Sequence, residues 1–169
     1  DNTAPTLSSV SIASNNSTTT LAKVADVVTL TFTASETIAT PVVTFLSDGD
    51  AINNTSVTYV NASGTTWTAA YTAHASDTDG SVTYSIAFSD SAGNAGTAVT
   101  SGSGSVTFDK TAPTLSSVSI ASNNSTSTLA AVGQVVTLSF TASETISTPV
   151  VTFLSDGDAI NNTSVTYVN

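Results

Sequence analysis

The sequence contains no cysteine, so neither a disulfide framework nor a thiolate zinc site can form. The fold must be held by packing, hydrogen bonds or oxygen-ligated ions, and calcium is the ion to consider. Methionine is also absent, and other helix-favouring residues such as Glu, Lys and Gln are rare. We therefore expect very little helix.

Long apolar runs are missing too. None approaches the roughly 20 residues that a membrane-spanning helix needs, so no membrane span is expected in this segment. No charged-then-apolar leader is present at the start, and we expect any targeting or anchoring signal to lie outside these residues.

Positive charge is scarce. The sequence has two lysines, no arginine and 12 acidic residues, which gives a net charge of −10. Such a balance argues against nucleic acid and against anionic membrane surfaces as partners, and makes cations the natural ones.

The residues that catalysis requires are few. The single histidine, His74, is expected in an exposed loop, and no Ser-His-Asp grouping is apparent. Asp77 and Asp79 could be imagined as a glycoside-hydrolase pair, but an aromatic-lined groove is lacking. We expect a protein that is not an enzyme.

Ser and Thr make up more than a third of the chain, and hydrophobic residues 40%. The apolar content and its regular alternation speak against disorder. Val28, Leu30 and Phe32 alternate with threonines, which predicts a strand with one core face and one hydroxyl face. Further alternating segments occur at 10–12, 43–45, 57–59, 66–72, 82–89 and 106–108. Turn residues such as Asn, Asp, Gly and Ser separate the strands.

Residues 1–61 and 109–169 are the same sequence with seven changes, so the period is 108 residues. We interpret residues 1–108 as one complete repeat, and residues 109–169 as the first four strands of the next. The seven pairs are Asn2/Lys110, Thr19/Ser127, Lys23/Ala131, Ala25/Gly133, Asp26/Gln134, Thr31/Ser139 and Ala39/Ser147.

Seven strands in about 100 residues predict an all-β, seven-stranded antiparallel immunoglobulin-like β-sandwich. The motif Asp-x-Thr-Ala-Pro-Thr at Asp1 and Asp109, together with Asp90-x-x-Gly93-Asn94, resembles the bacterial immunoglobulin-like tandem repeats of large surface adhesins. The resemblance implies an extracellular location on a bacterial cell surface and a role as a spacer in a stalk. Antibody domains have a disulfide that packs on a tryptophan of the third strand. This chain has no cysteine, and its only tryptophan, Trp67, is expected in the fifth strand, so that core is not shared.

Because successive strands of such a sandwich run in opposite directions, its loops gather at two ends, or poles, and the acidic residues are expected at both. Asp1, Glu36 and Asp90 are expected at one pole. Four more are expected at the other, beside Asp109: Asp48, Asp50, Asp77 and Asp79. Stacked repeats would bring Asp109, Glu144 and the lower-pole carboxylates together, which is unfavourable without a cation. Ca²⁺, which takes six to eight oxygen ligands, would relieve that repulsion.

Each acidic group has an alternative interpretation. Asp109 and Glu144 could be hydrated carboxylates, and Asp48-Gly49-Asp50 and Asp77-Thr78-Asp79 could be ordinary turns, since neither continues into an EF-hand loop. Asp90 to Asn94 is expected to form a tight turn with Gly93 or Asn94 at positive φ. Asp90 could also face an ion.

The junction between repeats has no Gly/Ser spacer, and Pro113 restricts Ala112 to extended conformations. An extended arrangement with neighbouring repeats as partners is therefore expected. The second copy, with only four predicted strands, would leave a half-open core. Strands from another chain could cover it, but we favour the interpretation that these residues belong to a longer array of repeats. Two alternative functions remain: a repeat of a self-assembling surface filament or matrix protein with lateral contacts, and a module that binds a glycan or surface.

Overall fold

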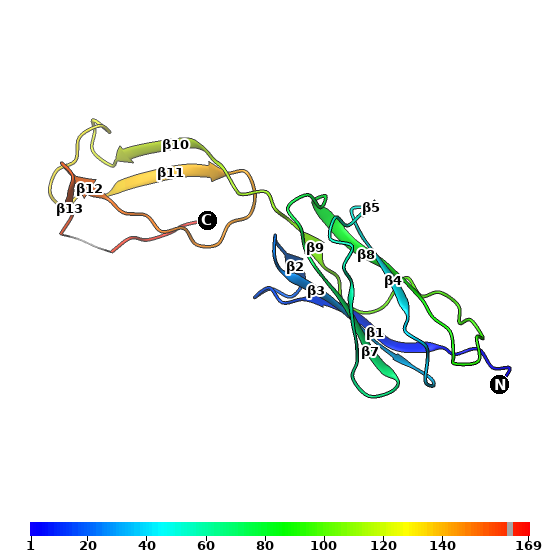
Figure 1. The fold of residues 1–169 in the computed structure, drawn as a ribbon. Helices are drawn as coiled ribbons and strands as arrows, with labels where there is room; N and C mark the ends of the chain where they lie inside the picture. Colours follow the sequence, from blue (N-terminus) through cyan, green and yellow to red (C-terminus); the bar gives the residue numbers. More distant parts are fainter. Residues whose placement is uncertain (162–163) are drawn as a thin grey trace. The chain divides into compact units, whose positions relative to one another are not determined.

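The computed structural model describes residues 1–161 and 164–169 and shows two compact units, Asp1–Thr111 and Ala112–Asn169. Both consist of β-strands and loops (Figure 1), so the expectation of very little helix is confirmed for the described residues. Within that part of the chain, no helix is long and apolar enough to cross a membrane. Asn162 and Thr163, in the second copy, lie outside the description.

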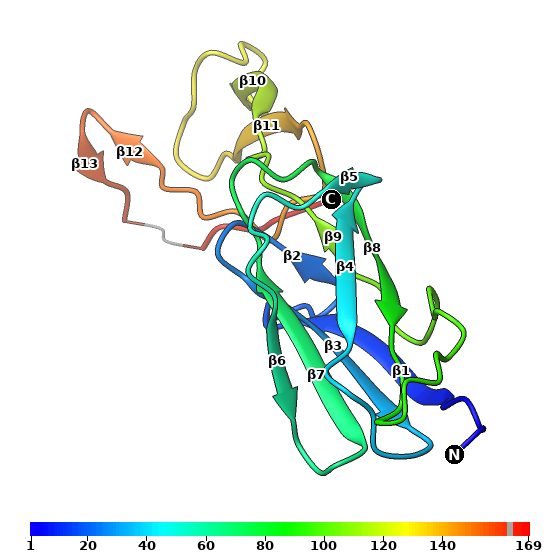
Figure 2. The same ribbon diagram turned by 45° about the vertical axis from the view of Figure 1, so that its right-hand side comes forward.

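One sheet of unit 1 has four antiparallel strands in the order β1-β3-β7-β6. Its strands are β1 (Leu7–Ser14), β3 (Val27–Ala34), β7 (Thr66–Thr72) and β6 (Thr58–Asn61). The central pair β3 and β7 is in register along its whole length, from Val27 opposite Thr72 to Thr33 opposite Thr66. Figure 2 shows β3, β7 and β6 running side by side.

The other sheet has five strands in the order β2-β9-β8-β4-β5. These are β2 (Leu21–Ala22), β9 (Thr107–Phe108), β8 (Gly80–Ala87), β4 (Val42–Ser47) and β5 (Asp50–Ala51). The long pair β4 and β8 is antiparallel, with Val42 opposite Ala87 and Ser47 opposite Val82.

The core of unit 1 lies between the two sheets, as the alternation predicts. In β3, Val28, Leu30 and Phe32 are fully buried, while the threonines between them are half-exposed. Tyr71 of β7 and Phe45 of β4 meet from opposite sheets, with ring centroids 4.8 Å apart. Unit 1 is therefore an all-β structure consistent with a β-sandwich.

Two features depart from the predicted plan of seven antiparallel strands. First, β2 pairs with β9 in parallel, with Leu21 opposite Thr107. The chain keeps its direction after β1, joins the second sheet for two residues, and turns back only at residues 23–26. Second, β5 forms a short hairpin with β4 through Asp48 and Gly49. Both turn residues have positive φ (52° and 87°), as a two-residue type I′ turn requires.

Unit 2 contains a smaller set of strands in its described part. β10 (Leu115–Ser122) and β11 (Val136–Ala142) form an antiparallel pair, and β12 (Leu154–Ser155) and β13 (Asp158–Ala159) form a short hairpin. The register of β10 and β11 repeats that of β1 and β3, including the irregularity beside Ser117, whose counterpart is Ser9.

Candidate functional site

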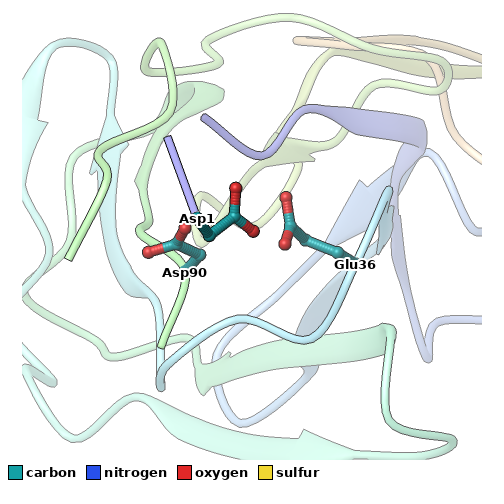
Figure 3. A group of neighbouring side chains, drawn as sticks. All are labelled: Asp1, Glu36 and Asp90. Carbon is teal, nitrogen blue, oxygen red and sulfur yellow. The ribbon is translucent and has the colours of Figure 1, made fainter. Parts of the chain in front are cut away.

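Three carboxylates gather at one end of unit 1. Asp1, Glu36 and Asp90 each offer a carboxylate oxygen, and the three oxygens lie within 4.8 Å of one another. Figure 3 shows Asp1 between the other two residues, with its carboxylate facing that of Glu36. These residues were expected to share one pole, and the structure brings them together although they are distant in sequence.

Asp90 is the buried member of this group, with 4% of its surface exposed. It begins a turn in which its backbone N–H donates to the carbonyl of Asn94 (3.1 Å) and Gly93 adopts a positive φ of 95°. The turn and the positive φ at Gly93 are thus confirmed. The Asn94 side-chain amide donates to one carboxylate oxygen of Asp90 (2.7 Å), and its backbone N–H donates to the other (2.7 Å).

These hydrogen bonds stabilise the charged form of Asp90. The side-chain hydrogen bond from Asn94 is the main reason why the pKa of Asp90 lies below its ordinary value, and burial opposes it. Asp90 is therefore an anion at neutral pH.

Glu36 lies on the connection from β3 to β4. Backbone contacts hold this connection in place both before and after Glu36. The backbone N–H of Ser35 donates to the carbonyl of Thr6 (2.9 Å), and the Ser35 hydroxyl accepts from the backbone N–H of Thr6 (3.0 Å). Ile38, two residues later, is buried and forms a β-bridge with Asp90. The half-buried Glu36 is therefore held beside the turn that carries Asp90.

Asp1 is exposed but anchored. Its carboxylate accepts the backbone N–H of Thr3 (2.8 Å), and its backbone carbonyl accepts the side-chain amide of Asn94 (3.1 Å). Asn94 thus contacts two of the three acidic residues. Sequence reasoning treated Asn94 only as a turn residue, because its second contact joins positions 93 residues apart.

Within the described part of the chain, no lysine or histidine side chain contacts the three carboxylates. Lys110 binds the opposite end of unit 1, where its ammonium group donates to the carbonyl of Asp77 (2.6 Å), and Lys23 follows β2. Like charges about 5 Å apart repel by around 1 kcal/mol in water and by more at lower dielectric. Two oxygens bound to one Ca²⁺ at about 2.3–2.6 Å can lie up to about 5 Å apart, so the spread of the cluster is compatible with a shared hard cation.

Three of the four acidic residues expected at the other pole, Asp50, Asp77 and Asp79, accept hydrogen bonds from donors of the chain itself. Asp77 is buried, and its carboxylate accepts the backbone N–H groups of Asn53 (2.7 Å) and His74 (2.8 Å). Asp50 accepts the hydroxyl of Thr78 (2.9 Å). The contacts of Asn53 with Asp77 and of Asp50 with Thr78 join residues 50–53 to the loop between β7 and β8, and the backbone N–H of Asp48 donates to the carbonyl of Ser81 in β8 (2.9 Å). His74 is exposed, as expected.

Asp79 binds the start of the second repeat. Its carboxylate accepts the backbone N–H of Lys110 (2.9 Å) and the hydroxyl of Thr111 (2.6 Å). The Thr111 hydrogen bond is the largest cause of the lowered pKa of Asp79. Unit 1 therefore extends to Thr111, past the end of the repeat at Phe108.

Asp109 and Glu144 lie in different units. The backbone N–H of Asp109 donates to the carbonyl of Ala22 (2.9 Å), and its carboxylate accepts the N–H of Thr111 (2.9 Å), as the carboxylate of Asp1 accepts that of Thr3. Glu144 is half-buried in unit 2. A shared calcium site for Asp109 and Glu144 stays a prediction, as does metal binding by Asp48, Asp50, Asp77 and Asp79.

Among the described residues, Asp1, Glu36 and Asp90 are the group of three or more potential metal ligands that the structure brings together. Comparison of the chain with protein-family models, curated proteins and solved structures found no match.

Proposed function

We propose that the chain is part of a tandem array of immunoglobulin-like repeats that acts as a spacer in the stalk of a large bacterial surface adhesin, stiffened by Ca²⁺ at the junctions between repeats. The resemblance of its motifs to such repeats, its acidic charge and its hydroxyl-rich strands support this role. Its partners are then the neighbouring repeats of the same chain, outside the cell.

One observation carries the proposal. Asp1, the first residue of a repeat, joins Glu36 and Asp90, while its counterpart Asp109 is hydrogen-bonded to Ala22 of the preceding repeat, inside unit 1. The backbone of Asp109 is thus bonded to the first repeat. By equivalence with Asp1, its carboxylate is expected to join the acidic residues of the second repeat. A cation bound there would link consecutive repeats.

The connection itself also supports a spacer. Lys110 and Thr111 are held by Asp79, and Lys110 also reaches the carbonyl of Asp77. The chain thus leaves unit 1 without a free flexible segment before Ala112, and Pro113 follows immediately. A short, anchored connection transmits force and orientation better than a Gly/Ser linker.

Calorimetric titration of the 169-residue chain with Ca²⁺ tests the binding step. We expect binding at this cluster that is lost in a Glu36→Gln, Asp90→Asn double variant and kept in an Asp158→Asn control, whose exposed carboxylate lies in unit 2 and belongs to none of the predicted sites. Equal binding by the double variant and the wild type would remove this cluster from the proposal.

A filament former is the alternative, and it predicts self-association. Light scattering of the purified chain at micromolar concentration separates the two functions, because a spacer stays monomeric. Affinity of a single repeat for a glycan or surface would favour the third candidate, a binding module.

A further inference from the structure

The outer edges of the two sheets in unit 1 are protected to different extents. Other strands can add to an open edge, and proteins prevent this with charges, proline, very short strands or a covering segment. β1 is covered by Ser103, whose N–H donates to the carbonyl of Val10 (2.8 Å) and whose carbonyl accepts the N–H of Ile12 (3.0 Å). β2 and β5, at the edges of the other sheet, are two residues long, and β5 carries Asp50.

The fourth edge, β6, has no charge, proline or covering strand in the described part of the chain. Its one sheet neighbour is β7, with which it pairs over four residues without a bulge. Figure 2 shows β6 at the side of unit 1. Residues 51–76 contain no Asp, Glu, Lys, Arg or Pro, and Val60 of β6 is 57% exposed. β6 is therefore an edge that another strand can extend.

The backbone groups available at this edge follow from the contacts with β7. Ala62, directly after β6, donates its backbone N–H to the carbonyl of Thr66 (2.8 Å). Successive residues of a strand direct their N–H and C=O groups to opposite sides. The backbone groups of Tyr59 and Asn61 therefore point away from β7, toward the open side of the sheet.

β6 is also held in the extended conformation that pairing requires. The hydroxyl of Tyr59 accepts the backbone N–H of Val43 in β4 (2.9 Å), which ties β6 to the other sheet. The hydroxyl of Thr58 donates to the carbonyl of Ala70 in β7 (3.3 Å). An incoming strand thus meets an ordered edge, and less entropy is lost on binding.

The charge distribution favours a second copy of the same edge as the partner. None of the four strands β1, β3, β7 and β6 contains a charged residue. Two chains of net charge −10 can therefore meet at β6 without bringing carboxylates into contact. An antiparallel edge is also self-complementary, because each strand supplies the donors and acceptors that its copy needs.

We propose that β6 pairs with β6 of a second molecule, so that the two four-stranded sheets join into one. The strands run antiparallel, with Val60 opposite Val60 of the other copy. In this register Tyr59 lies opposite Asn61 of the other copy, and these two residues exchange both backbone hydrogen bonds. The two Val60 side chains pack together on the outer face of the joined sheet.

Antiparallel pairing also determines how the two molecules run. Asp1 lies at one end of unit 1, and the connection held by Asp79 leaves from the other end. Paired units therefore run in opposite directions, as in molecules that project from two facing surfaces. This last step rests on the proposed spacer function, whereas the pairing of β6 does not.

The contact is small, because β6 is four residues long. Stable interfaces bury at least about 1,200 Å², so we expect a weak contact with a dissociation constant of about 1 mM. The chain is then monomeric at micromolar concentration and pairs where molecules are crowded. NMR spectra of the 169-residue chain between about 50 µM and about 2 mM measure this pairing. We expect concentration-dependent shifts of the backbone amides of Tyr59 and Asn61.

A pair of lysine variants makes the NMR test specific. Val60→Lys should abolish the concentration-dependent shifts, because it places a charge at the pairing edge. Thr83→Lys, at an exposed position of the central strand β8, should keep them. Both variants lower the net negative charge equally, so a general charge effect would change them alike. Calcium titration of Val60→Lys should match the wild type, which separates this contact from the proposed calcium site.

Cross-linking tests the register. The chain has no cysteine, so Val60→Cys introduces a single thiol. Facing residues of a pair without mutual hydrogen bonds lie close enough for a disulfide. Under mild oxidation, Val60→Cys should give about tenfold more disulfide-linked dimer than Thr83→Cys, because pairing raises the effective concentration of the thiol. Equal dimer yields, or unchanged concentration dependence in Val60→Lys, would overturn the proposal.

Discussion

The side-chain amide of Asn94 donates a 2.7 Å hydrogen bond to the carboxylate of Asp90 and so holds this buried anion at the end of unit 1. The same amide reaches the backbone carbonyl of Asp1. One neutral side chain thus positions two of the three acidic residues without neutralising them. The arrangement keeps the Asp90 carboxylate ionised and close to those of Asp1 and Glu36, and clustered carboxylate oxygens are ligands that Ca²⁺ prefers.

Asn94→Ala removes these contacts. We expect a lower unfolding midpoint in urea for unit 1, and weaker calcium binding, because the Asp90 carboxylate loses its charge-stabilising donor. Asn61→Ala is the control, since Asn61 donates only to the carbonyl of Gly64 in an exposed turn. Equal losses in the two variants would contradict a special role for Asn94.

The stability of unit 1 should depend on pH in the acid range. The pKa of Asp90 in the folded state lies below the ordinary value of 3.8, as do those of Asp26 and Asp79. Folding therefore favours the ionised forms, and this stabilisation is complete above the unfolded-state pKa and is lost as the pH falls through the lower folded-state values. We expect the melting temperature to fall steadily below about pH 4.

Thermal unfolding followed by circular dichroism between pH 6 and pH 2 measures this effect. An Asp90→Asn variant should show a shallower decline, because one of the three linked groups is gone. A melting temperature that rises as the pH falls from 4 to 2 would contradict the direction of these pKa shifts.

The difference between the copies at residue 25 predicts a stabilising substitution. Ala25 has φ 73°, and its counterpart Gly133 has φ 85°. An L-residue in this region costs about 1–2 kcal/mol, whereas glycine adopts it freely. Ala25→Gly should therefore raise the free energy of unfolding of unit 1 by about 1 kcal/mol, less the entropy that glycine adds to the unfolded chain.

Urea unfolding checks the Ala25 prediction, with Ala39→Ser as the control because it also replaces a residue of the first copy by that of the second. Ala39 is exposed and does not have a positive φ. A loss of stability in Ala25→Gly would show that the backbone strain is not relieved.

The anchored connection gives a further prediction. Thr111→Val removes the hydroxyl that binds Asp79, so the pKa of Asp79 should rise toward its ordinary value and the backbone amide of Lys110 should exchange faster. Thr107→Val, in β9, should leave both unchanged. NMR titration and hydrogen exchange measure the two quantities.

Much of unit 1 could be predicted from the sequence. Alternation located the segments that contain β1, β3, β4, β6, β7, β8 and β9, most of which have one face in the core. It missed β2 and β5, whose two residues lie in segments without an alternating pattern. The pole of Asp1, Glu36 and Asp90 followed from the count of strands. The burial of Asp77 did not, since its partner Asn53 lies 24 residues away and belongs to another loop.

The central claim is that calcium stiffens the junction between repeats, and small-angle X-ray scattering of a protein with two complete repeats tests it most directly. We predict that millimolar Ca²⁺ increases the maximum dimension and raises the melting temperature. Both effects should be lost in an Asp109→Ala, Glu144→Ala variant and kept in Asp158→Asn, which removes an exposed carboxylate of the second repeat that belongs to none of the predicted sites. If neither quantity changes with Ca²⁺, calcium does not order the junction and the account of a stiffened spacer is wrong.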